Sequence, residues 1–140
     1  MGFQTISPAV STITPITPSG KDVQVKAFTV ARTETASVLK CELPADASIL
    51  YIVREGSVAS NAATTATVTI TVANNGGTVS SKADDVKGGG ATTDFVSMSA
   101  LPNLQPMPLN GDLAITAVYA ETGTASTTGG PWNYLVAYAR

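Results

Sequence analysis

The sequence predicts an all-β domain, built as an antiparallel two-sheet β-sandwich or jelly roll with an extended N-terminal arm. Apolar and polar residues alternate with a period of two along most of the chain after Lys21, and Gly- and Asn-rich turns separate the alternating runs. Helix signals are nearly absent. We expect residues 1–20 to form the arm and residues 21–140 to form one sandwich domain of about eight strands.

Alternating runs define the expected strands. In VQVKAFTV, Val23, Val25 and Ala27 alternate with Gln24 and Lys26, which predicts a half-buried strand. The same alternation occurs in SILYIVRE, TATVTITVA, DLAITAVYAE and PWNYLVAYAR, with these residues aligned on one side: Val68, Ile70 and Val72; Leu113, Ile115, Ala117 and Tyr119; Trp132, Tyr134, Val136 and Tyr138. The three aromatic residues of the last run could line a sugar-binding face, but their alternation favours a place in the core.

Turn residues stand between these runs. VANNGGTVSS predicts a hairpin between a strand that ends near Ala73 and one that starts near Thr78, and the Asn-Gly of LNGD predicts a turn. SSKADDVK, residues 80–87, is the one helix-like stretch, since a serine could cap it and Gly88 could end it. The following KGGGATT is expected to be a flexible loop.

The proline-rich stretch LPNLQPMPLNGD, residues 101–112, is of a different kind. Its three prolines, Pro102, Pro106 and Pro108, forbid a central strand, so we expect it to cross one end of the sandwich. Its apolar residues would cap the core or face a partner, and core capping is favoured.

Composition excludes several classes of function. Only 13% of residues are charged, the net charge is −2, and the eight Lys and Arg residues are scattered, so the surface is rich in hydroxyls and offers no basic stripe for nucleic acid. The chain has one cysteine and no histidine, which removes the usual zinc and copper ligands and favours Cys41 as a small buried apolar residue. It shows neither a secretory signal nor a run of about 18 apolar residues, so we expect no membrane insertion.

Candidate catalytic groups are few. Asp84 and Asp85 are adjacent, so their carboxylates diverge, and solvated loop charges are the expected interpretation. Together with Asp94 they lack the spacing of a specific calcium loop. We therefore expect no enzyme activity, no cofactor and no metal site.

Residues 40–140 resemble small virion proteins of tailed bacteriophages, the capsid decoration (cement) and head accessory proteins. The resemblance is carried by CELPADASILYIVREGSVASNAATTATVTITVANNGG, in which a Leu43-Pro44-Ala45 turn leads into strands over residues 49–53 and 66–72, and by the ending LAITAVYAETGTASTTGGPWNYLVAYAR. It implies a non-enzymatic subunit on the outer surface of a phage head that binds the major capsid protein, forms a homo-oligomer such as a trimer, and is made in the host cytoplasm. The alternative is a receptor- or carbohydrate-binding module of a head fibre or tail, using loops such as 88–93 and 123–131.

The uncharged N-terminal stretch MGFQTISPAVSTITPITPSG has scattered apolar residues and regular prolines, so it cannot form a continuous face of its own. Three interpretations are open: an arm that lies along a partner surface, an arm that folds back on its own sandwich, and a mobile tail. The first is preferred, and its interface candidates are Phe3, Ile6, Val10, Ile13 and Ile16.

Overall fold

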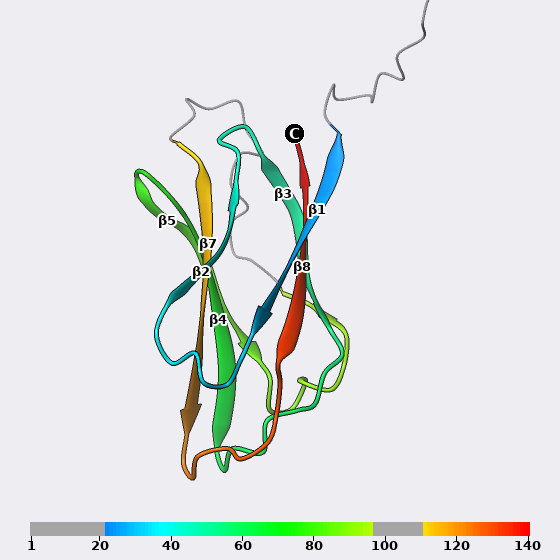
Figure 1. The fold of residues 1–140 in the computed structure, drawn as a ribbon, viewed down its shortest axis with the longest axis vertical. Coiled ribbons are helices and arrows are strands. Elements are labelled where there is room, and N and C mark those ends of the chain that lie inside the picture. The colour runs from blue at the N-terminus through cyan, green and yellow to red at the C-terminus, as the bar shows by residue number, and fades with distance from the viewer. Residues whose placement is uncertain (1–21, 97–110) are drawn as a thin grey trace, which may run out of the picture.

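The computed structural model describes residues 22–96 and 111–140, which form two four-stranded antiparallel sheets packed face to face (Figure 1). The strands are β1 (Val23–Val30), β2 (Val38–Leu43), β3 (Ser48–Glu55), β4 (Thr65–Asn74), β5 (Gly77–Asp85), β6 (Asp94–Phe95), β7 (Leu113–Thr122) and β8 (Trp132–Ala139). Sheet 1 has the order β1-β8-β3-β6 and sheet 2 the order β2-β7-β4-β5. The predicted all-β sandwich is confirmed.

Strand pairing is nested, because β1 pairs with β8, β2 with β7, β3 with β6, and β4 with β5. This is the pairing of one long antiparallel hairpin that has been rolled up. Rolling brings β8 against β3 and β7 against β4, which completes the two sheets. The topology is therefore that of a jelly roll.

The core lies between the sheets and follows the predicted alternation in β4, β7 and β8. Trp132 and Tyr134 are fully buried, and their rings stack on Tyr119 and Phe28 with centroid distances of 5.2 Å and 5.3 Å. Large aromatic rings bury much apolar area and dominate the energetics of such a core. The core role predicted for the aromatic residues of β8 is confirmed.

Alternation in β1 predicted that the side of Val23, Val25 and Ala27 faces the core, but the opposite side does. Phe28 and Val30 are buried, whereas Val23 and Val25 are 64% and 57% exposed. β1 is an edge strand, so its polar residues can reach partners: the Lys26 ammonium donates to the Glu42 carbonyl of sheet 2 at 2.6 Å, and the Tyr138 hydroxyl donates to Gln24 at 2.8 Å.

The short helix expected over residues 80–87 is absent, because residues 77–85 form β5. This strand pairs with β4 from Asn74↔Gly77 to Thr67↔Asp85, so the ladder satisfies the backbone groups that a helix would otherwise satisfy internally. The hairpin predicted between a strand that ends near Ala73 and one that starts near Thr78 is confirmed, since β4 ends at Asn74 and β5 starts at Gly77.

The two ends of the sandwich differ. Loops 56–64, 86–93 and 123–131 gather at one end, and the turn at 44–47, the β4–β5 turn and the starts of β1 and β7 lie at the other (Figure 1). Gly111, which precedes β7, has φ +79°, a conformation that suits glycine. Residues 97–110, and with them most of the proline-rich stretch, lie outside the described residues, as does the arm of residues 1–20.

Candidate interaction surface

The outer side of sheet 1 carries a continuous apolar surface. Strand register aligns Val25, Ala137 and Tyr51 in one row across β1, β8 and β3. We call the outward-facing residues of this region the apolar face; they are Val23, Val25 and Ala27 of β1, Leu135 and Ala137 of β8, and Tyr51 and Val53 of β3. Ala137 is fully buried although it is not part of the core cluster between the sheets. Its side chain points outward and is covered by its neighbours in this row.

The apolar face is nearly free of charge. Among the outward residues of β1, β8 and β3, only Glu55 is charged, and it lies in a polar row with Thr29 and Asn133 at one end of the face. A hollow of about 370 Å³ opens at this end beside Leu135. Exposed apolar patches on a soluble domain mark contact sites for other molecules.

The outer side of sheet 2 has a different character. Thr67, Thr69 and Thr71 of β4 point outward, and the Thr71 hydroxyl bonds the Ser81 hydroxyl of β5 at 3.0 Å. Thr65 and Thr122 make a similar contact at 2.6 Å between β4 and β7. The outer side of sheet 2 therefore carries threonine and serine hydroxyls, some of which bond to each other, together with apolar residues such as Leu39 and Val118.

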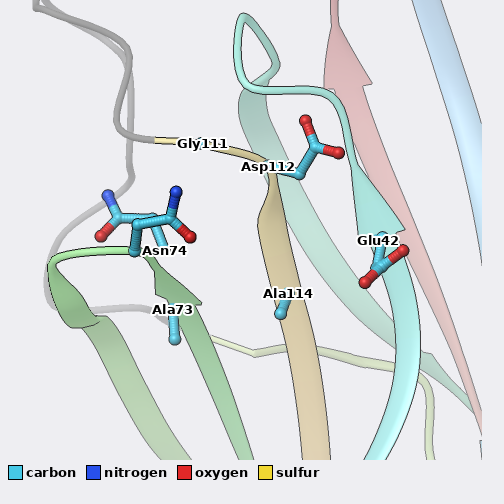
Figure 2. Close-up of a pocket in the computed structure, with 7 residues that line it drawn as sticks. Glu42, Ala73, Asn74, Gly111, Asp112 and Ala114 are labelled. Carbon is cyan, nitrogen blue, oxygen red and sulfur yellow. The ribbon is translucent and has the colours of Figure 1, made fainter.

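A polar depression of about 480 Å³ lies on sheet 2 beside the β4–β5 turn (Figure 2). Its floor is formed by Ala73 and Ala114, and its rim carries Glu42 and Asp112 together with Asn74 (Figure 2). Two of these side chains have local partners: Asp112 accepts from the Ala45 amide at 3.1 Å, and Asn74 accepts from the Gly76 amide at 2.8 Å. The depression has carboxylates on its rim but lacks a converging set of ligands.

A buried polar cluster connects the two sheets. Arg54 of β3 is fully buried and donates to the Asp84 carboxylate of β5 at 2.6 Å, and the Tyr134 hydroxyl donates to the same oxygen at 2.8 Å. Arg54 also donates to the carbonyl oxygens of Asp85, Gly89 and Thr92. Burial raises the pKa of Tyr134, and the neighbouring Asp84 carboxylate raises it further. The phenol therefore stays protonated and acts as a donor.

The prediction that Asp84 is a solvated loop charge is wrong. Asp84 is buried on a strand because Arg54 compensates its charge, as a buried carboxylate requires. Its neighbour Asp85 does act as expected of an exposed turn residue, since it accepts from the amides of Lys87 and Gly88 at 2.8 Å and 3.1 Å. The sequence signal that could have indicated this cluster is a charged residue at an inward position of an alternating strand, as Arg54 is in SILYIVRE.

The glycine loop after β5 is held tightly in place. Gly89 accepts a hydrogen bond from Arg54, and a Cβ added at Gly90 would lie 2.1 Å from the Val86 carbonyl oxygen. The Ser57 amide donates to the Gly90 carbonyl at 3.1 Å, which ties this loop to the β3–β4 connection. KGGGATT is thus a closely packed loop, and its glycines allow the close approach.

The neighbouring loops are joined in the same way. Asn61 accepts from the amides of Thr127 and Thr128 at 2.9 Å and 3.0 Å, and the Gly130 amide donates to the Val58 carbonyl at 2.9 Å. Tyr119 joins the group from the core side through hydroxyl contacts with Ser60, Glu121 and Ser126. Loops 56–64, 86–93 and 123–131 therefore form one connected end of the sandwich.

The arm residues predicted to form an interface, Phe3, Ile6, Val10, Ile13 and Ile16, lie outside the described residues. Within residues 22–96 and 111–140, no three His, Cys, Asp or Glu side chains group in a way that could hold a metal ion. The described part of the chain also contains no helix of the length and hydrophobicity that crossing a membrane needs.

No protein-family model matches the sequence, and no curated protein matches it. Among solved structures, a chain of the cyanophage Pam1 capsid asymmetric unit is similar, with a TM-score of 0.51 and 20% identity. The match covers 85% of this chain and 84% of that chain, so it spans nearly the whole described domain. The two chains share a fold.

Proposed function

We propose that this protein is a structural component of a phage virion, a decoration (cement) subunit that binds the major capsid protein on the outside of the head. The observation that carries the proposal is the nearly uncharged apolar face on sheet 1, whereas the outer side of sheet 2 carries a row of threonines along β4. The shared fold with a chain of a cyanophage capsid unit, and the resemblance of residues 40–140 to virion proteins, support it. We infer a structural role and no catalysis.

A modest apolar surface suits a subunit that is repeated by symmetry. Each copy needs only a weak contact, because many copies act together on one particle and multivalent contacts reinforce one another. In this proposal the apolar face supplies the main contact, the arm residues Phe3, Ile6, Val10, Ile13 and Ile16 supply further ones, and the subunits associate as trimers on the head.

Co-sedimentation with phage heads that lack this protein tests the proposal. Wild-type protein should bind to saturation, with a copy number compatible with the symmetry of the shell. Val25→Asp places a charge in the central row of the apolar face and should weaken binding by about tenfold or more, as an unpaired charge in an apolar contact does. Thr69→Asp adds the same charge to the outer side of sheet 2 and should bind as the wild type does.

Two outcomes would contradict the proposal or relocate the contact. Absence of wild-type binding to heads would contradict a decoration role. Loss of binding in Thr69→Asp with normal binding in Val25→Asp would move the contact to sheet 2.

A receptor- or carbohydrate-binding role is the second candidate, and the connected loop end favours it. Loops 88–93 and 123–131 are far apart in sequence but are tied to each other through residues 56–64. Recognition loops that are fixed in advance lose little entropy on binding. Reproducible hits on a glycan array that disappear in Thr127→Ala or Thr92→Ala, with unchanged stability, would favour this role over decoration.

A further inference from the structure

The start of the described chain lies beside the apolar face. Backbone hydrogen bonds in both directions between Asp22 and Arg140, at 2.7 Å and 3.0 Å, fix the beginning of β1 against the end of β8. Val23 follows directly and is 64% exposed. The described chain therefore starts at the edge of this face, and residues 1–20 precede it in the sequence with Lys21 between them.

Those residues match the apolar face in chemistry. Residues 1–20 contain no charged side chain, and their apolar residues recur every three or four positions between Thr, Ser and Pro. A neutral segment loses little hydration of charge when it lies on a nearly uncharged surface. Residues 1–20 and the apolar face therefore share a low charge and a high content of apolar side chains.

The size of the face argues for an attached occupant. Three strands of eight residues each, as in β1, β3 and β8, span about 14 Å by 26 Å, or about 400 Å². A stable interface between separate proteins buries about 800 Å² per partner, so a second copy of the sandwich would gain too little on this face alone. A segment tethered at its edge has an effective concentration of about millimolar and needs a smaller contact.

The segment is also long enough. Twenty extended residues reach about 65 Å, more than twice the length of the face, so the segment can turn and run along it. We propose that, in the free protein, residues 1–20 lie on the apolar face of the same chain. The inference goes beyond the proposed function because it concerns the protein before it meets any shell; shell binding would then exchange one apolar contact for another.

Tyrosine nitration by tetranitromethane tests this contact in the full-length protein. Of the four tyrosines in the sequence, Tyr51 on the apolar face is 44% exposed, whereas Tyr119, Tyr134 and Tyr138 are buried. If residues 1–20 cover the face about nine-tenths of the time, nitration of Tyr51 should be about tenfold slower than in N-acetyltyrosine amide. Ile13→Asp/Ile16→Asp should restore fast nitration.

Thr14→Asn/Thr17→Asn is the matched control, because it changes two neighbouring positions of the same segment without adding charge or removing apolar residues. It should keep both the protection of Tyr51 and the wild-type thermal midpoint. Ile13→Asp/Ile16→Asp should lower the midpoint slightly, because a contact made about nine-tenths of the time stabilises the folded state about tenfold. The protection should not change over a hundredfold range of protein concentration.

Two results would overturn the inference. One is fast nitration of Tyr51 in the wild type, with no difference among the three proteins. The other is protection that grows with concentration together with a dimer in sedimentation, which would assign the face to a second copy. Because no phage heads are present, neither result bears on shell binding.

Discussion

The Arg54 guanidinium on β3 and the Asp84 carboxylate on β5 lie 2.6 Å apart in the interior and join sheet 1 to sheet 2. Both groups are more than nine-tenths buried. The same arginine holds the glycine loop through carbonyl oxygens, so one side chain connects the packing of the sheets to the connected loop end.

Removing the carboxylate should be strongly destabilising. Asp84→Asn leaves the Arg54 charge buried without its partner, and we expect the free energy of unfolding to fall by about 3–5 kcal/mol. Urea unfolding at pH 7 measures this change. Asp85→Asn is the control, because an exposed asparagine can still accept from the amides that follow it, and its effect should stay within about 0.5 kcal/mol.

The double variant Arg54→Leu/Asp84→Leu tests whether the effect comes from the unpaired charge. It removes both charges, so the loss should be smaller than the sum of the losses in Arg54→Leu and Asp84→Leu. Additive losses would mean that the two groups stabilise the domain independently of each other.

The tight loop gives a second prediction, at Gly90. A Cβ at this position would lie 2.1 Å from the Val86 carbonyl oxygen, so Gly90→Ala must displace backbone, and we expect a loss of about 2 kcal/mol or more. At Gly88 the Cβ would meet only the Asp85 carboxylate, which can rotate away. Thermal unfolding of the two variants should therefore show a clear drop for Gly90→Ala and a small one for Gly88→Ala.

Glu121 should contribute to the acid sensitivity of the domain. Hydrogen bonds from Ser126 and Tyr119 hold the pKa of the Glu121 carboxyl below its ordinary value of 4.5. A lowered pKa in the folded state means that this stabilisation is complete above pH 4.5 and is lost as the pH falls through the folded value. In Glu121→Gln the free energy of unfolding should therefore fall less steeply between pH 5 and pH 3 than in the wild type. Urea unfolding at each pH measures this difference.

Tyr119→Phe offers an independent check on the same carboxylate. It removes one of the two donors, so the pKa of Glu121, followed by NMR titration, should rise toward 4.5. An unchanged pKa would show that Tyr119 does not stabilise the charged form.

Cys41 should react slowly with thiol reagents. It packs against the edge of the core, and burial raises the pKa of its thiol above the ordinary value of 9.0. Because the thiolate is the reactive form, alkylation by iodoacetamide at pH 8 should be several-fold slower than for free cysteine. As the chain has a single cysteine, mass spectrometry of the intact protein reports this rate directly, and a rate equal to that of free cysteine would contradict the burial.

Sequence reasoning predicted most of the fold. Alternation in β4, β7 and β8 and the Asn-Gly turn at residues 75–76 were sufficient, because a two-residue period and turn chemistry are local properties. The inward side of β1 and the strand character of residues 80–85 could not be predicted in this way. The inward side of β1 depends on a partner far along the chain, since Phe28 stacks on Tyr134. Residues 80–85 lack a clear period of two, and they form a strand because they pair with β4.

The candidate interaction surface and the buried polar cluster were also missed, because they join residues that are far apart in the sequence. Asp84 was interpreted as a surface charge because it stands beside Asp85 in a charged stretch, whereas its partner Arg54 stands thirty residues earlier. The apolar face is equally non-local, since it arises only when Val25, Ala137 and Tyr51 are placed in one row by strand register. The charge-poor composition indicated a hydroxyl-rich surface and did not indicate an apolar face on sheet 1.

The nested pairing of the strands has a consequence for synthesis on the ribosome. Val23 of β1 pairs with Ala139 of β8, so the first strand has no partner in its sheet until the ribosome has made the chain as far as the last one. Among the strands of residues 22–96 and 111–140, only β4 and β5 can pair as neighbouring segments while they emerge. The nascent chain therefore exposes most of its strand edges until late, and a chaperone that shields such edges should increase the yield of folded protein more than one that acts after release.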